Sequence, residues 1–212
     1  MSAGERGPAA QTQALLVMDV QNGVVGRFAE QAGPFLDTLA GAVAAARAAQ
    51  VPVVYVRVAF RQGMPEVSRR NRTFSALAGS GGFGESDAAT GVHPAVAPRS
   101  GDVVVTKRRV SAFSGSDLDV VLRSLDVGSL VLTGIATSGV VLSTLRQAAD
   151  LDFSLTVLAD GCVDADPEVH RVLLEKVFPR QAEVVTAAEW IGRLRSDGHG
   201  GPGPPTAGTM PA

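Results

Sequence analysis

Three polar features each follow an apolar run in this sequence. Asp19 comes after residues 14–18, Lys107 after residues 102–106, and a glycine-containing turn, 134–140, after residues 130–132. A carboxyl group can exchange a proton, and an ammonium group can hold a nearby negative charge. A tight turn before a helix presents backbone N–H groups to an anion. Together these groups could perform acid–base chemistry on a small anionic molecule.

The elements that must position these groups follow from the apolar pattern. Short apolar runs alternate with segments of helical spacing, which predicts an α/β fold with a parallel sheet covered on both faces. We therefore expect a three-layer α-β-α, Rossmann-like domain with a six-stranded sheet. Ligands bind beyond the carboxyl ends of the strands in such sheets, so the three features should share one rim. The predicted strands are residues 14–18, 53–58, 102–106, 130–132, 155–158 and 182–185.

Predicted helices begin where capping residues precede helical spacing. One starts near residue 32, and others follow the pairs Ser138-Gly139 and Asp166-Pro167. The pairs Ser116 with Asp119 and Thr186 with Glu189 have capping-box spacing. Residues 60–100 lack clear periodicity, which predicts a long loop. The G-x-G-x-x-G pattern at 79–84 follows no strand and opens no helix, so it indicates a flexible loop and not a dinucleotide site.

Size and composition limit the class of protein. A chain of 212 residues with 45% hydrophobic and 19% charged residues predicts one compact domain. We place it at residues 13–195, between a flexible lead, 1–12, and a disordered tail, 196–212. A net charge of −2 gives no basis for nucleic-acid or membrane-surface binding. Cys162 is the single cysteine, which excludes an internal disulfide. With no apolar run of membrane length and no signal-like start, we expect a cytoplasmic protein.

Three segments stand out as motifs: Leu-Leu-Val-Met-Asp-Val-Gln-Asn at 15–22, Thr-Lys-Arg-Arg-Val-Ser-Ala-Phe at 106–113 and Gly-Ile-Ala-Thr-Ser-Gly-Val-Val at 134–141. They resemble the landmark motifs of the isochorismatase-like hydrolase superfamily, which includes nicotinamidases, N-carbamoylsarcosine amidases and isochorismatases. The resemblance covers residues 13–192. In the amidase branch it implies an Asp–Lys–Cys triad, of which Asp19 and Lys107 match two members. Val140 stands at the cysteine position and has no nucleophilic atom, so covalent catalysis there is impossible.

The isochorismatase branch implies a reaction without cysteine, because hydrolysis of a vinyl ether needs a proton donor more than a nucleophile. Our leading hypothesis is therefore a cysteine-free hydrolase of a small anionic substrate, with Asp19 as acid/base and Lys107 as electrostatic partner. Burial raises a carboxyl pKa and a neighbouring ammonium lowers it, so both protonation states of Asp19 stay open here. One alternative is a catalytically silent metabolite-binding or regulatory member. Another is an amidase that uses Cys162 or an activated water.

Further residues are candidates for substrate contact. Gln21 and Asn22 could orient a polar group or water beside Asp19, and an arginine between the second and third strands could bind a carboxylate. The hydroxyls of Thr137 and Ser138 are more typical of helix capping than of a nucleophile. The remaining candidates are Phe28, Arg61, Arg70 and Phe113, with the backbone of Ala136, Thr137, Ser138 and Gly139 as the anion-binding turn.

The last predictions concern the backbone, cofactors and assembly. The resemblance implies a cis peptide bond between Ile135 and Ala136, and a homo-oligomer, either a dimer or a tetramer. His93, His170 and His199 lack the spacing of metal ligands, so we predict neither a metal nor another cofactor.

Overall fold

The structure is a computed structural model that describes residues 12–197, without the side chains of Ala29, Gln31, Ser80 and Asp197. Most of the predicted lead (1–12) and tail (196–212) lies outside the described residues. The structure describes only their inner ends. The first strand already includes Thr12, and the last helix continues through Ser196 to Asp197.

The sheet has six strands in the order β3-β2-β1-β4-β5-β6, and every neighbouring pair is parallel. This confirms the predicted α/β class. Leu15, Leu16 and Leu132 are fully buried, because helices cover both faces of the central strands. The strand bounds are β1 Thr12–Met18, β2 Val53–Val58, β3 Val103–Lys107, β4 Val127–Ile135, β5 Ser154–Val163 and β6 Glu183–Val185.

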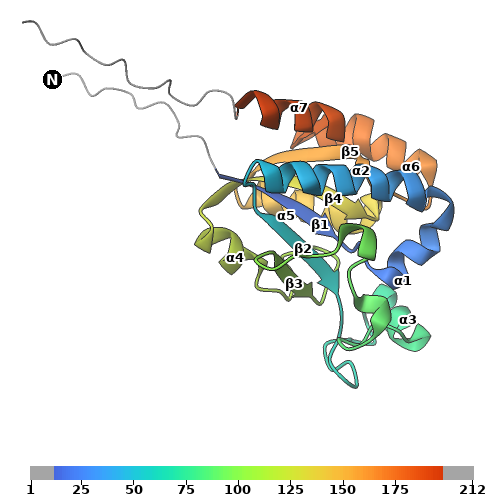
Figure 1. Ribbon diagram of the computed structural model, residues 1–212. Helices are drawn as coiled ribbons and strands as arrows, with labels where there is room; N and C mark the ends of the chain where they lie inside the picture. The colour runs from blue at the N-terminus through green and yellow to red at the C-terminus, as the bar shows by residue number, and fades with distance from the viewer. Residues whose placement is uncertain (1–11, 198–212) are drawn as a thin grey trace, which may run out of the picture.

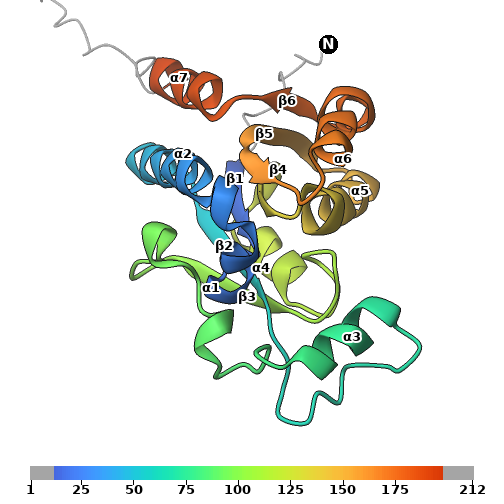
Figure 2. The same ribbon diagram turned by 90° about the vertical axis from the view of Figure 1, so that its right-hand side faces the viewer.

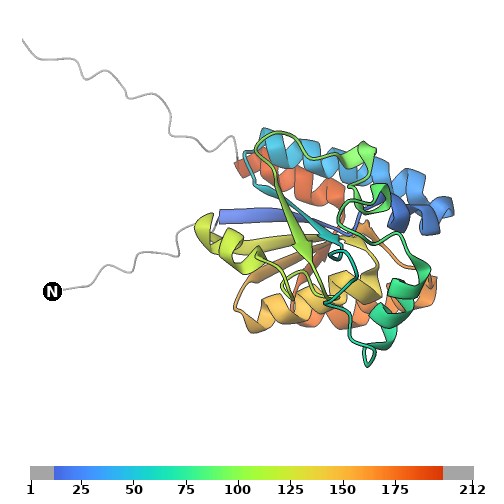
Figure 3. The same ribbon diagram turned by 90° about the horizontal axis from the view of Figure 1, so that it is seen from below.

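Two helical layers enclose the sheet (Figures 1 and 3). Helices α2 and α7 cover one face, where Leu39 and Trp190 belong to one buried cluster. Helices α4, α5 and α6 lie on the other face, where Leu122 and Leu145 belong to a second cluster. The helix bounds are α1 Asn22–Val25, α2 Ala29–Ala48, α3 Arg72–Ser80, α4 Leu118–Ser124, α5 Leu142–Asp150, α6 Pro167–Val172 and α7 Ala187–Asp197.

Irregular helical segments complete the chain. A π-helix, Thr137–Val141, leads directly into α5, and a second, Leu173–Val177, continues α6. Short 3₁₀ turns occupy Gly26–Phe28, Ala88–Thr90, Pro94–Val96 and Phe178–Arg180.

Two of the predicted helix caps are confirmed. The Asp166 carboxylate accepts the N–H groups of Glu168 and Val169 at 2.9 and 3.2 Å. Thr186 and Glu189 cap α7 reciprocally, since each backbone N–H donates to the other side chain, at 2.7 and 3.2 Å.

The capping box predicted for Ser116 and Asp119 is wrong. The Ser116 hydroxyl instead donates to the carbonyl of Ala112 at 2.6 Å and accepts the N–H of Leu118 at 3.3 Å, and Asp119 pairs with Arg123 one helical turn later. The helix consequently begins at Leu118, after a residue whose side chain makes no capping bond.

Residues 60–91 form a lobe beside the sheet, seen below the main body in Figure 2. The prediction of a loop throughout was wrong, because this lobe contains α3. The side chain of Asn71 caps α3 by accepting the N–H of Phe74 at 3.1 Å. Phe60, Phe74 and Phe83 then form a small separate core under the lobe. The three phenylalanines come from distant positions in the sequence and leave little periodic signal, so the sequence did not reveal α3.

Candidate functional site

The strand order reverses between β1 and β4, because the chain moves outward to β2 and β3 on one side and to β5 and β6 on the other. Connections that leave in opposite directions open a crevice at the carboxyl ends of the two strands. Asp19 follows the end of β1 there, and the segment after Ile135 follows the end of β4. Lys107 ends β3, two strands away from β1, so its long side chain must reach across the end of β2.

Lys107 and Asp19 meet in a buried ion pair, with 2.9 Å between Nζ and Oδ2. Only 2% of Lys107 and 8% of Asp19 is exposed. The Lys107 ammonium also donates to the backbone carbonyls of Arg109 and Val110, at 2.9 and 3.0 Å. An ammonium group has three hydrogens, and three acceptors already surround it. Lys107 is therefore placed to act through its charge and not as a proton donor to a substrate.

Asp19 keeps one oxygen uncommitted. Among the described residues, its buried Oδ1 atom has no hydrogen-bond partner. Burial raises the pKa of the Asp19 carboxyl above its ordinary value, although the Lys107 ammonium acts in the opposite direction. The backbone at Asp19 has a φ of 55°, in the left-handed region that aspartate tolerates better than most residues. A carboxyl with one anchored and one uncommitted oxygen can exchange a proton with a group that reaches the uncommitted oxygen.

The turn after β4 approaches β1 very closely. A Cβ atom on Gly134 would lie 2.1 Å from the carbonyl oxygen of Met18, and the φ of Gly134 is +139°. Only glycine fits such a position. The peptide bond between Ile135 and Ala136 is cis. Beyond it, Val140 is 2% exposed and belongs to the same buried cluster as Met18.

The predicted anion-binding turn is partly occupied by the protein itself. The N–H of Ser138 donates to Oδ2 of Asp164 at 2.7 Å, and that of Gly139 donates to the Ala136 carbonyl at 3.0 Å. These two donors are not available to an anion, so the prediction is confined to Ala136 and Thr137. The predicted cap by Ser138 and Gly139 is also wrong, because the helix N-cap is Ala136 and no local side chain caps it.

The side-chain amides of Gln21 and Asn22 form hydrogen bonds to the protein backbone. The Gln21 amide nitrogen donates to the carbonyls of Val58 and Thr90 at 3.0 and 2.9 Å, and its oxygen accepts the Val58 N–H at 2.9 Å. Gln21 thus fixes the segment after Asp19 to the end of β2, with its amide fully engaged. Asn22 donates to the carbonyl of Ala88 at 2.9 Å. Neither amide is held ready for a ligand by these contacts.

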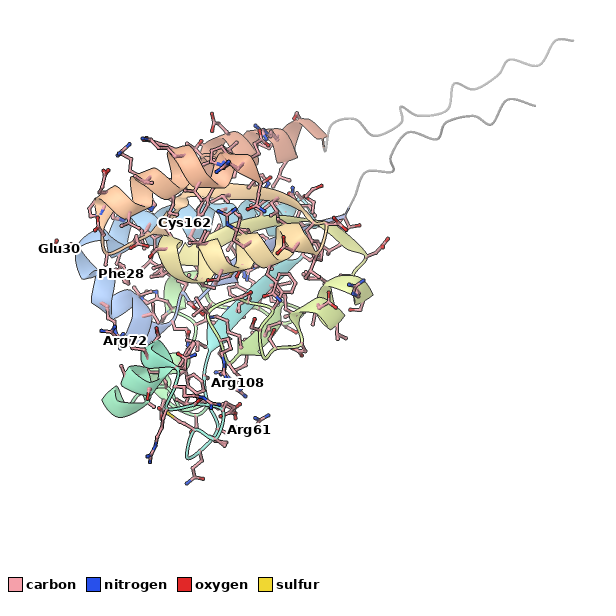
Figure 4. The ribbon with its side chains drawn as sticks, turned by 180° about the vertical axis from the view of Figure 1, so that it is seen from behind. Phe28, Glu30, Arg61, Arg72, Arg108 and Cys162 are labelled. Carbon is pink, nitrogen blue, oxygen red and sulfur yellow. The ribbon has the colours of Figure 1, made fainter. Side chains whose placement is uncertain are left out.

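The aromatic and cationic candidates are spread over the molecule. Phe113 packs on Phe153 with ring centroids 6.0 Å apart, and Phe28 packs partly buried against the α2 and α7 core. Arg61 pairs with Glu66 at 2.6 Å and lines an open hollow of about 620 Å³ outside β3. Figure 4 shows Arg61 beside Arg108, away from Phe28. Neither Asp19 nor Lys107 lines that hollow, and Arg70 is exposed on the 60–91 lobe.

Cys162 lies inside β5 and not after it, because that strand is longer than predicted. The thiol is 3% exposed, and burial raises its pKa to about 12. The thiolate is the reactive form of cysteine, so a thiol this resistant to ionisation is a poor nucleophile at neutral pH. The structure therefore favours a packing role for Cys162.

We predict that iodoacetamide leaves Cys162 of the folded protein unmodified, as measured by mass spectrometry of the intact chain. Urea-unfolded protein is the control and should be alkylated once. A Cys162→Ala variant should keep any hydrolytic activity, since the thiol touches no reacting group. Rapid alkylation of the native protein together with loss of activity would restore the cysteine mechanism.

Sequence reasoning missed the side chains that hold the site from behind. Gln147 accepts the hydroxyl protons of Ser111 and Ser114, at 2.7 and 3.2 Å, and Thr144 accepts the N–H of Ala112 at 2.9 Å. These α5 residues fix the loop whose carbonyls hold Lys107. Asp164 and His170 were missed as well. Asp164 directly follows β5, so the rule that ligand sites lie beyond strand ends could have drawn attention to it.

Two further findings concern the described residues only. Within residues 12–197, no group of three or more His, Cys, Asp or Glu side chains is arranged to hold a metal ion. None of the helices in that range is both long and apolar enough to cross a membrane.

The fold and the sequence match known proteins. The isochorismatase domain family matches residues 13–189. The chain is 31% identical over 185 residues to the uncharacterized isochorismatase family protein YwoC of Bacillus subtilis, covering 87% of this chain and 95% of that protein. It is 34% identical over 195 residues to ureidoacrylate amidohydrolase RutB of Methylobacterium radiotolerans, covering 78% and 73% respectively. A crystal structure of a cysteine hydrolase from Pseudomonas syringae pv. phaseolicola superposes with a TM-score of 0.80 at 27% identity, covering 87% and 93%.

The chain therefore belongs to the isochorismatase family, and by that membership it is a hydrolase. Asp19, Lys107 and the turn before α5 all lie within the residues that match the family, 13–189.

Proposed function

We propose that this protein hydrolyses a small, anionic, unsaturated substrate, such as an enol ether, without a covalent intermediate. The observation that carries the proposal is the Asp19–Lys107 pair. One carboxyl oxygen is anchored 2.9 Å from the ammonium group, and the other is buried without a partner. Val140 occupies the nucleophile position and leaves proton transfer as the chemistry that this site can perform.

The proposed reaction begins with protonated Asp19. Its proton moves to the terminal carbon of the carbon–carbon double bond, and the ether oxygen shares the positive charge that forms. Water adds to the charged carbon, and the proton that water loses returns to the Asp19 carboxylate. The hemiketal hydroxyl then passes its proton to the leaving oxygen as the bond between carbon and that oxygen breaks, giving a ketone and an alcohol. Asp19 ends protonated, so the cycle consumes only substrate and water.

Lys107 would act during the charge separation of the first step. When Asp19 gives up its proton, a carboxylate forms in a buried place, which is unfavourable without a compensating charge. The ammonium 2.9 Å away compensates it. Because the two backbone carbonyls hold this ammonium, it would need no rearrangement at the moment of reaction.

A second candidate is amide hydrolysis by water activated at Asp19. It is favoured by the 34% identity to a protein named ureidoacrylate amidohydrolase. In this reaction Asp19 starts ionised and accepts a proton from water, so the required protonation state is the reverse of the first candidate. We rank it second because it rests on a relative's name, whereas burial shifts the pKa of Asp19 upward, the direction that the first candidate needs.

Substrate screening separates the two candidates. Purified protein would be assayed against isochorismate, simple carboxylated enol ethers, ureidoacrylate and uncharged amides. In deuterated water, addition of the proton to carbon slows the enol-ether reaction and leaves deuterium on the new carbon–hydrogen bond. Turnover of ureidoacrylate alone would favour the amidase. Tight binding of a metabolite without any turnover would reject both reactions and would favour a catalytically silent, metabolite-binding protein.

The arginine that would bind the substrate anion remains a proposal. Arg61 is 64% exposed and paired with Glu66, beside a hollow that Asp19 does not line. Arg70 is exposed on the 60–91 lobe. We also propose a cytoplasmic location and a homo-oligomer, either a dimer or a tetramer. Size-exclusion chromatography with light scattering would measure the number of subunits.

A further inference from the structure

The segment that follows β5 holds the first turn of the π-helix through two side chains. Oδ2 of Asp164 accepts the N–H of Ser138 at 2.7 Å. Thr137 Oγ1 lies 2.8 Å from Nδ1 of His170, within hydrogen-bond distance. Two adjacent residues of the turn are thus bonded to a segment 26 to 33 positions further along the chain.

Asp164 acts as a helix cap supplied from another part of the chain. The continuous helix from Thr137 to Asp150 has Ala136 at its N-cap, which offers no side-chain acceptor. The first N–H groups of a helix need acceptors, and a carboxylate is favoured there by the helix dipole. Asp164 is 8% exposed, and its other oxygen accepts the N–H of Asp166 at 3.3 Å. Both of its oxygens are therefore committed to backbone.

In the contact between Thr137 and His170, the threonine is buried and the histidine is partly exposed. Thr137 is fully buried, and its hydroxyl is within hydrogen-bond distance of the His170 ring. Burial lowers the pKa of the half-buried His170, and the nearby Asp164 charge opposes this more weakly. Asp164 bonds to backbone N–H groups and not to the imidazole. These facts exclude a Thr–His–Asp catalytic triad and leave the imidazole as a hydrogen-bonding support.

We propose that Asp164 and His170 are positioning residues that hold the turn 136–140 in place beside Asp19. The turn requires such support because its own bonds are irregular: the Ala136 carbonyl accepts the N–H groups of both Gly139 and Val141, at 3.0 and 3.3 Å. A π-helix of this kind is less regular than an α-helix and often occurs at functional sites. The inference rests on the proposed function, in which Asp19 transfers the proton during hydrolysis.

Paired variants test the Thr137 contact. Thr137→Val keeps the shape and removes the hydroxyl, whereas Thr137→Ser keeps the hydroxyl. His170→Ala removes the ring, and His170→Asn keeps a polar group near the Nδ1 position. Thr73→Val, at an exposed position of α3, is the control for the loss of a threonine hydroxyl alone. Circular dichroism and thermal unfolding would confirm that each variant folds.

Two measurements report on these variants. Steady-state kinetics should show kcat falling about tenfold in Thr137→Val and His170→Ala, with KM little changed, because misplaced reacting groups slow the chemical step. Thr137→Ser and His170→Asn should recover most of the loss. Hydrogen exchange by NMR should show faster exchange of the Ser138 and Val141 amides in Thr137→Val, with no change in Thr73→Val.

The outcomes separate this inference from the proposed function. Unchanged kcat and unchanged exchange in Thr137→Val would overturn the inference even if the wild-type protein is active. Loss of kcat that the Ser and Asn variants fail to recover would also contradict it. If the wild-type protein hydrolyses no compound in the panel, the proposed function fails. Faster exchange in Thr137→Val would then still support a clamped turn, and unchanged exchange would reject it.

Discussion

Asp19→Asn is expected to lower kcat/KM at least about a hundredfold, because positioned acid–base groups contribute roughly 10²–10⁴ in rate. Asparagine preserves the shape of the side chain but can neither give up nor take the catalytic proton. Steady-state kinetics on the substrate identified by screening would measure the loss. Asp150→Asn, at an exposed carboxylate on the end of α5, is the matched control and should be neutral. Undiminished activity in Asp19→Asn would reject the mechanism.

The pH dependence of the same carboxyl gives a second test of this variant. Burial raises the Asp19 pKa above its ordinary value of 3.8, so the folded protein binds this proton more tightly than the unfolded chain. Its contribution to stability is therefore greatest at low pH and declines as pH rises from about 4 through the folded pKa. For the enol-ether reaction, which needs the acid form, activity should decline over the same range.

Urea unfolding across a pH series would measure this contribution. The free energy of unfolding of Asp19→Asn should lack the decline that Asp19 causes in the wild type. Above the folded pKa of Asp19, the variant also lacks the anionic partner of the buried Lys107 ammonium, which should lower its stability there. A difference between the two proteins that rises with pH, and does not fall, would show that Lys107 dominates and the pKa of Asp19 is lowered.

Gly134→Ala is expected to have the largest effect on stability, a loss of about 4 kcal/mol or more. The added Cβ would lie 2.1 Å from the Met18 carbonyl oxygen, in the centre of the sheet. Overpacking typically costs about 1–3 kcal/mol, and a backbone conformation reserved for glycine costs about 1–3 kcal/mol more. Domains of this kind are stable by only about 5–15 kcal/mol, so much of the variant should be unfolded or insoluble.

Gly41→Ala is the matched control for that substitution. Gly41 lies on the exposed side of α2, and an added Cβ would meet no atom within 4 Å. Replacing glycine by alanine inside a helix should stabilise the protein by about 0.5–1 kcal/mol. Urea denaturation of the three proteins would measure both changes. A Gly134→Ala protein as stable as the wild type would show that β1 and β4 can separate without penalty.

The sequence by itself determined the elements whose signal is local. Each of the six apolar runs corresponds to a strand, and Asp166 and the Thr186–Glu189 pair cap helices as their spacing predicts. Parallel strands place their carboxyl ends on one rim, so the meeting of Asp19 and Lys107 followed from strand positions alone. The resemblance puts Val140 at the cysteine position, and a side chain without a nucleophilic atom excludes covalent catalysis at that position whatever the fold.

Only the tertiary structure decided how those groups are held. The saturation of the Lys107 ammonium depends on two carbonyls in a loop, and the cap of the π-helix comes from Asp164, 26 residues beyond Ser138. The side-chain amide of Gln21 is occupied by hydrogen bonds to the backbone carbonyls of Val58 and Thr90. Hydrogen bonds between residues so far apart in sequence leave no periodic pattern. Which donors remain available for a substrate is therefore a property of the folded chain.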